Sequence, residues 1–116
     1  MVRAMKRIEA VVQPFKLEDV KQVLTALGIS GMTVSEVKGF GRQRGHSETY
    51  RGSDYRIEFV PKVKIEVIVP EGRLQEIVTA VVEAARTGSI GDGKIFVMPV
   101  ADVVRIRTGE TDEQAL

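Results

Sequence analysis

The sequence has no cysteine, no tryptophan and little net charge, and each shortage excludes a class of protein. Without cysteine, disulfides, zinc–thiolate sites and thiol nucleophiles are excluded. No run approaches the roughly 18 apolar residues of a membrane-spanning helix, and Met1 to Arg7 lacks the apolar core of a secretory signal. A net charge of +1 falls short of the basic excess that non-specific nucleic-acid binding needs. We therefore expect one cytoplasmic domain over residues 1–116, with no membrane insertion and no nucleic-acid partner.

The pattern of apolar residues predicts two similar halves. Short β-branched or alternating runs indicate strands, and spacings of three and four indicate helices, the first of them capped by Gly28. The expected elements are strand 8–12, helix 17–27, strand 32–40, strand 63–69, helix 74–85 and strand 95–98, with 103–107 as its candidate continuation past Pro99. This order predicts an α+β, ferredoxin-like βαββαβ sandwich with both helices on one face of an antiparallel sheet. If the other face is also apolar, it needs a partner, so we expect a homo-oligomer.

A long polar segment separates the second and third predicted strands. Residues 42–56 include no aliphatic side chain, but they include His46 and both tyrosines, Tyr50 and Tyr55. We expect an exposed loop at about 41–57, because a segment this polar cannot pack and loops of this length are usually functional or disordered. Two interpretations stay open. The loop is either a solvated hairpin extension or a segment that docks a partner or is modified at a hydroxyl, which would add charge and bulk.

The glycine-rich stretch from Thr87 to Lys94 is the strongest candidate site. Gly88 and Gly93-Lys94 fit the G-x-x-x-x-G-K part of a P-loop, but Ile95 stands where a magnesium-binding Ser or Thr belongs. A P-loop also runs from strand to helix, whereas this stretch runs from helix to strand. The chain is therefore not expected to be a P-loop NTPase.

The same stretch still has the ingredients of a polyphosphate site. Glycines let backbone N–H groups approach an anion, and Lys94 adds a positive charge. Arg105 and Arg107 are two apart on a segment expected to be extended, so both guanidinium groups would point the same way and could hold phosphate oxygens. Asp92 would face a ribose, a metal or its own turn. The alternative is a tight turn with surface cations. No catalytic set of side chains is recognisable, so we expect no enzyme.

Three blocks of sequence carry a family resemblance. They are Gly39-Phe40-Gly41-Arg42-Gln43, Tyr50-Arg51-Gly52-Ser53-Asp54-Tyr55 and the segment 87–97 with its Gly-Asp-Gly-Lys core. Residues 13–17 and 105–110 match as well. With these blocks the chain resembles the PII family of nitrogen signal-transduction proteins, from about residue 5 to residue 107 and beyond. Met1 to Ala4 precede the usual start of the family.

The resemblance implies a homotrimer that binds ATP or ADP in the clefts between neighbouring subunits. It implies that 2-oxoglutarate binds beside MgATP, with Gln43 contacting both the Mg²⁺ ion and the oxoacid and Lys62 pairing with the distal carboxylate. The residues implied to hold the phosphates are Gly91, Asp92, Gly93 and Lys94, assisted by Arg42, Arg105 and Arg107. Gly41 is implied to be a further binding residue. Thr33, Glu66 and Ile68 are implied to line the adenine and ribose side.

The resemblance also implies that the long loop reports the state of this site to partners. In the family these include an ammonium transporter, nitrogen-metabolism enzymes, regulators and kinases, so a cytoplasmic protein would be recruited reversibly to the membrane by a transporter. Tyr55 falls at a position of uridylylation or adenylylation and Ser53 at one of phosphorylation, which leaves the type of modification open. Asp54 departs mildly from the family. The polar residues 109–116 are expected to be a mobile tail.

Two other functions compete with this hypothesis. One is a structural trimer of the same fold that binds no nucleotide. The other is a small phosphate-handling enzyme, which would need an arginine-bearing phosphate loop near the N-terminus that this chain lacks.

Overall fold

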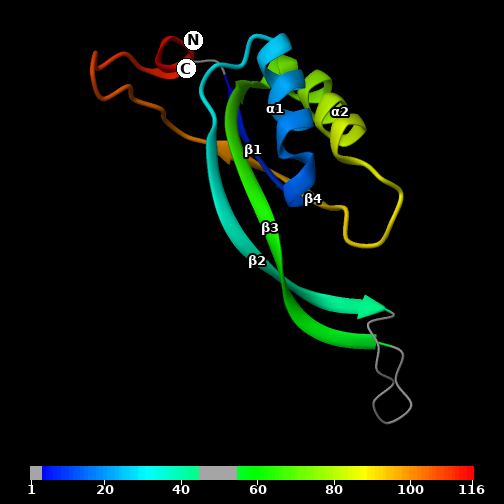
Figure 1. The fold of residues 1–116 in the computed structure, drawn as a ribbon. Helices are drawn as coiled ribbons and strands as arrows, with labels where there is room; N and C mark the ends of the chain where they lie inside the picture. The colour runs from blue at the N-terminus through cyan, green and yellow to red at the C-terminus, as the bar shows by residue number, and fades with distance from the viewer. Residues whose placement is uncertain (1–3, 45–54) are drawn as a thin grey trace.

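The computed structural model describes the backbone of residues 4–44 and 55–116 and the side chains of residues 4–39 and 59–116. Its strands form one antiparallel sheet in the order β2-β3-β1-β4, and both helices cover one face of it (Figure 1). The elements are β1 (Met5–Val12), α1 (Leu17–Ala26), β2 (Thr33–Arg44), β3 (Tyr55–Pro70), α2 (Leu74–Ala85) and β4 (Gly93–Val100). The predicted α+β ferredoxin-like fold is confirmed.

Strand register explains the core. Ile8 and Ala10 of β1 pair with Val67 and Ile65 of β3, so these side chains share the face that the helices cover. The helices add Val20 and Leu24 from α1 and Ile77 and Val81 from α2, all nearly inaccessible to solvent. Each such aliphatic side chain contributes about 1.5–3 kcal/mol when it is buried. The core thus fixes which residues of β1 and β3 face away from the helices.

The first helix ends as its sequence predicts. Gly28 has a φ of +84°, which a residue without Cβ adopts easily. Its N–H donates to the Thr25 carbonyl at 3.0 Å, and the Ile29 N–H donates to the Leu24 carbonyl at 2.9 Å. This is a Schellman motif, and it turns the chain toward β2.

The predicted range of the loop, about 41–57, extends into a strand at each end. Residues 41–44 belong to β2 and residues 55–57 to β3, with Arg44 pairing with Tyr55. The two strands extend past the helices as a two-stranded arm (Figure 1). Polar residues form strands here because each strand supplies backbone partners to the other, a condition that a search for aliphatic alternation does not detect. His46, Tyr50 and Ser53 lie outside the described residues.

The C-terminal part of the chain corrects one expectation. β4 runs through Pro99 to Val100, but 103–107 does not continue it: Val104 makes only an isolated bridge to Thr111, and residues 106–108 form a turn. The tail that follows folds back on this segment. The Asp112 N–H donates to the Val103 carbonyl at 3.1 Å, and Asp112–Ala115 form a 3-10 helix.

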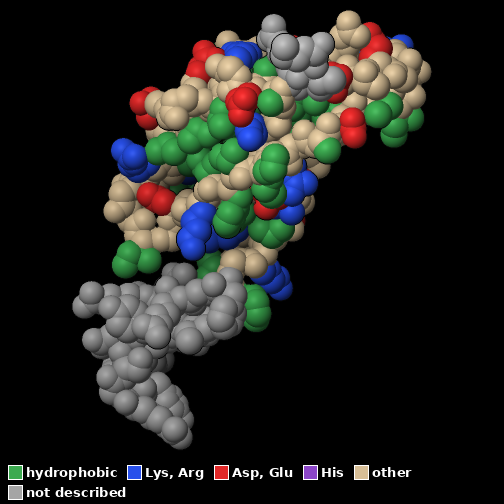
Figure 2. Space-filling view, turned by 180° about the vertical axis from the view of Figure 1, so that it is seen from behind, with side chains coloured by type: hydrophobic (Ala, Val, Ile, Leu, Met, Phe, Trp, Pro, Cys, Tyr) green, Lys and Arg blue, Asp and Glu red, His purple; other side chains and the backbone are tan. Residues whose placement is uncertain are grey.

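The face of the sheet opposite the helices mixes apolar and charged side chains. Phe96 is half exposed there, and Ile68, Met98, Arg7 and Glu66 share the face by register. Figure 2, seen from behind, shows hydrophobic side chains interspersed with Lys and Arg. This is the face that the predicted homo-oligomer would cover. Among the described residues, neither helix has the length and apolar character needed to span a membrane.

Candidate functional site

The glycine-rich loop, residues 87–94, is closed by its own aspartate. The Asp92 carboxylate accepts hydrogen bonds from the Thr87 hydroxyl and from the N–H groups of Thr87 and Gly88, the latter two at 2.8 Å each. The Thr87 hydroxyl, followed by its N–H, holds the pKa of the Asp92 carboxyl below its ordinary value. Of the three roles considered for Asp92, the structure shows the third: it holds its own turn.

Glycine is required in this loop for steric reasons. Gly91 and Gly93 have φ values of +98° and +104°. A Cβ on Gly93 would lie 1.8 Å from the Val11 carbonyl oxygen, and one on Gly91 would lie 3.2 Å from Nε2 of Gln13. The loop therefore packs directly against the end of β1. The absence of side chains also leaves its backbone open to approach by a ligand.

Lys62 connects this loop to the arm. It is the only charged residue that is buried among those whose side chains are described, at 8% exposure. Its ammonium group donates a hydrogen bond to the Gly91 carbonyl oxygen. An ammonium group has three donors, and lysine is seldom buried without a partner. Lys62 thus places a buried ammonium group beside the glycine-rich loop, where it could bind an anion.

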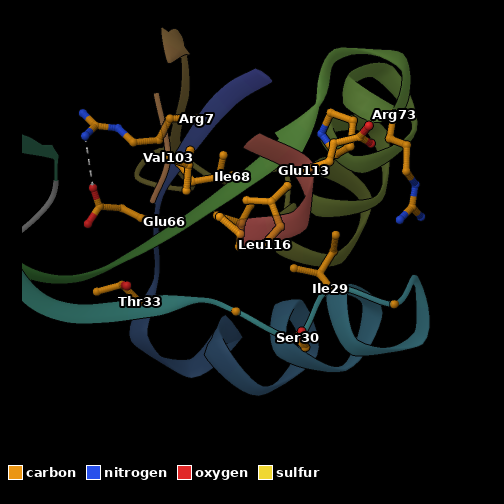
Figure 3. A pocket seen from close by; sticks show the side chains of 15 residues that line it. Arg7, Ile29, Ser30, Thr33, Glu66, Ile68, Arg73, Val103, Glu113 and Leu116 are labelled. Atoms are coloured by element: carbon orange, nitrogen blue, oxygen red, sulfur yellow. Dashed lines mark ion pairs between the residues drawn. The ribbon is translucent and has the colours of Figure 1, made fainter. Parts of the chain in front are cut away.

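Thr33, Glu66 and Ile68 lie together, at a cavity of about 610 Å³ (Figure 3). Thr33 pairs with Glu66 across β2 and β3, and Ile68 follows two residues later, so all three share one face. We call this the sheet cavity. Its other walls are the 28–31 loop, Arg7, Arg73, Val103 and tail residues Glu113, Ala115 and Leu116.

Arg105 and Arg107 do not lie on the extended segment that we expected. The chain turns at 106–108, which separates them. Nη2 of Arg105 donates to the Leu116 carbonyl oxygen at 2.6 Å, and Nη1 lies 3.6 Å from Glu110, while Arg107 is exposed. The expectation failed because it assumed an extended strand, whereas the segment folds back on the tail.

The glycine-rich loop and the sheet cavity lie apart in one chain. On β1, Val12 pairs with Gly93 of β4, whereas Glu9 pairs with Glu66 of β3. That offset is about 10 Å along the strands and about 10 Å across them. Gly93, Asp92 and Lys94 line a second cavity of about 320 Å³, which shares no lining residue with the sheet cavity.

The side chains of several predicted site residues lie outside the part of the chain that the structure describes. Gly41, Arg42 and Gln43 lie on β2 and Tyr55 begins β3, but their side chains, like Ser53, lie outside the described residues. Within the described part, no group of three His, Cys, Asp or Glu side chains is placed to hold a metal.

Sequence reasoning missed Arg7 and the tail. The alternation of Arg7 and Glu9 on β1 signals that both face the same way. No sequence signal places Leu116 at the sheet cavity, because that contact depends on the course of the tail.

Comparison with known proteins identifies a family. A family model described as nitrogen regulatory protein P-II matches residues 5–110. Nitrogen regulatory protein P-II 1 of Escherichia coli (strain K12) is 57% identical over 112 residues, which are 97% of this chain and 100% of that protein. The P-II protein of Synechocystis sp. is 60% identical with the same coverage of both chains.

Solved structures give the same result. A B. subtilis GlnK–ATP complex has a TM-score of 0.83 at 32% identity, with 100% of this chain and 99% of that chain covered. Arabidopsis thaliana PII bound to citrate has a TM-score of 0.80 at 42% identity, with 98% and 94% covered. Fold, loop and relatives together show that the chain belongs to the P-II family of nitrogen regulatory proteins.

Proposed function

We propose that this protein senses nitrogen status by binding ATP or ADP between neighbouring copies of the chain, in a homotrimer. The observation that carries the proposal is the separation of two chemically complementary regions in one chain. The glycine-rich loop with Lys62 and Lys94 is cationic, whereas the sheet cavity combines the Glu66 carboxylate with Arg7, Arg73 and apolar side chains. When copies assemble, the loop of one would meet the sheet cavity of the next.

The side chains of the two regions favour different ends of the nucleotide. Phosphate oxygens favour Lys94 and the open backbone of Gly91 and Gly93. A carboxylate such as Glu66 only accepts hydrogen bonds, so it suits the hydroxyl and amine donors of the nucleoside and repels phosphate. Thr33 and Ile68 would complete the nucleoside side. The ATP bound to the similar B. subtilis GlnK supports nucleotide binding as such.

Arg42, Arg105 and Arg107 would assist the phosphates. The donors of Arg105 that serve Leu116 and Glu110 in this structure would have to leave these partners before they could turn to phosphate. Nucleotide binding would therefore compete with the folded tail. The folded tail would therefore lower the affinity for ATP, which can be tested by removing the tail.

The oxoacid 2-oxoglutarate would bind beside MgATP, next to Lys62. Gln43 would contact Mg²⁺, which would neutralise phosphate charge, and Lys62 would take the distal carboxylate. Lys62 suits this role because it is buried and its described partner is a neutral carbonyl, whereas a hydrogen bond between charged groups is about twice as strong. Such binding would weaken the contact between Lys62 and Gly91 and so change the loop.

The arm of β2 and β3 would carry the output. It extends beyond the helices (Figure 1), which suits a segment that reaches a partner. An ammonium transporter, nitrogen-metabolism enzymes and regulators are the proposed partners of this cytoplasmic protein, with reversible recruitment to the membrane by the transporter. Tyr55 and Ser53 are the proposed modification sites, by nucleotidylylation and phosphorylation respectively.

Calorimetry with ATP, Mg²⁺ and 2-oxoglutarate tests the proposal. Lys62→Ala should weaken 2-oxoglutarate binding by about 10- to 100-fold, the worth of a charged hydrogen bond, and ATP binding by much less. Lys64→Ala, two residues along the same strand, is the matched control and should change neither. If the unmodified protein binds no 2-oxoglutarate with MgATP present, the sensing function fails.

The competing functions have separate signatures. A structural trimer would bind no nucleotide at all. An enzyme would release phosphate from ATP over many turnovers, which a phosphate assay at micromolar protein would detect.

A further inference from the structure

Arg7 of β1 lies between two carboxylates on the open face of the sheet. Its Nη2 is 3.3 Å from Glu9, and its Nη1 is 3.8 Å from Glu66. Figure 3 shows Arg7 and Glu66 together at one end of the sheet cavity, away from Arg73. The guanidinium group therefore bridges an acid on its own strand and an acid on β3.

The strand register makes this bridge necessary. Glu9 pairs directly with Glu66 across β1 and β3, and like charges directly opposite each other in an antiparallel pair repel. On the other side of β1, Glu9 pairs with Phe96 and Arg7 with Met98, neither of which is charged. Among the described contacts, Arg7 is the cation that both carboxylates share.

The guanidinium group of Arg7 does not make all the hydrogen bonds that it could. Its Nε is buried without a hydrogen-bond partner within the described residues, and Nη2 also contacts the Met98 sulfur at 3.2 Å. A buried donor without a partner costs stability, and a thioether sulfur is a weak acceptor. In this arrangement the Nε of Arg7 lacks a hydrogen bond, but the contacts of Arg7 to Glu9 and Glu66 are kept.

We propose that Arg7 is a positioning residue: it cancels the repulsion from Glu9 and fixes the Glu66 carboxylate at the end of the sheet cavity, where Glu66 accepts hydrogen bonds from the nucleoside. This inference rests on the proposed nucleotide function. In it, Arg7 does not touch the phosphates. Its loss should therefore affect the nucleoside part of ATP more than the triphosphate.

The test measures ATP and inorganic triphosphate binding by calorimetry, with the assembly state checked by light scattering. Arg7→Gln should weaken ATP binding about tenfold, the effect of losing one well-placed hydrogen bond, and triphosphate binding by less than about twofold. Arg7→Lys should bind almost like the unmodified protein. Lys6→Gln, the neighbouring residue whose ammonium pairs with Glu71, is the charge-matched control and should change neither.

The decisive variant adds Glu9→Gln to Arg7→Gln. It removes the opposing charge, so ATP affinity should recover most of the loss, a result that general loss of packing would not give. The inference is overturned if Arg7→Gln weakens ATP and triphosphate equally, which would make Arg7 a phosphate ligand, or if Glu9→Gln gives no rescue. If the unmodified protein binds no ATP, the proposed function fails and this inference with it; a protein that binds ATP normally without Arg7 refutes the inference alone.

Discussion

The glycine-rich loop and the sheet cavity are built by opposite means. The loop closes on itself: Asp92 reaches back to Thr87 and Gly88, five and four residues away. The sheet cavity joins segments from across the chain, from Arg7 on β1 to Leu116 in the tail. Local hydrogen bonds make the loop a feature that its own residues specify, whereas the sheet cavity exists only once the sheet and the tail are in place. Perturbations of the two regions should therefore differ in kind.

The largest effect is expected at Gly93. Gly93→Ala would place a Cβ 1.8 Å from the Val11 carbonyl oxygen at a φ of +104°, so β1 and β4 must separate. We expect a loss of at least about 3 kcal/mol in the free energy of unfolding, as for severe overpacking with backbone strain. Urea denaturation measures it.

Gly88→Ala is the control within the same loop. Gly88 also has a positive φ, +90°, but a Cβ added there would meet no atom within 4 Å beyond its chain neighbours. It should lose only about 1–2 kcal/mol, the cost of the left-handed conformation. Equal losses at Gly88 and Gly93 would show that the close approach to β1 does not matter.

A smaller, pH-dependent effect is expected at Asp92. Hydrogen bonds lower the pKa of this carboxyl in the folded protein below its ordinary 3.8, so the unfolded chain takes up the proton first. The stabilisation is therefore complete above that value and is lost as pH falls through the folded pKa. Asp92→Asn should lower the urea midpoint at pH 7 and flatten its decline below about pH 4. A parallel decline in both proteins would contradict the role of Asp92 as the closure of the loop.

The smallest effect is expected at the sheet cavity. Removal of residues 112–116 would take Glu113 and Leu116 from its wall and free one side of Arg105. Since a hydrogen bond such as that from Arg105 to Leu116 contributes about 1 kcal/mol net, ATP affinity should rise by up to about fivefold, with little change in the urea midpoint. Calorimetry of the shortened chain measures this, and a fall in affinity would show that the tail supports the nucleotide instead of competing with it.

Sequence reasoning succeeded where a single element carries the signal. The spacing in α2, the Gly28 cap and the strand around Ile65 were all predictable, because periodicity and capping are properties of neighbouring residues. It failed for the polar ends of β2 and β3, whose strand form depends on their mutual pairing. It failed again for Arg105, because the turn at 106–108 and the contact with Leu116 depend on where the tail folds.

The chain's own pattern of apolar residues and glycines was enough to determine the ferredoxin-like sandwich and the position of the glycine-rich loop. Both depend on short-range chemistry: side-chain alternation, helix spacing and backbone freedom. Only the tertiary structure decided that Arg7 bridges Glu9 and Glu66, that Lys62 is buried against Gly91, and that the glycine-rich loop and the sheet cavity lie apart. These relations join residues far apart in the sequence, and strand register together with the path of the chain sets them.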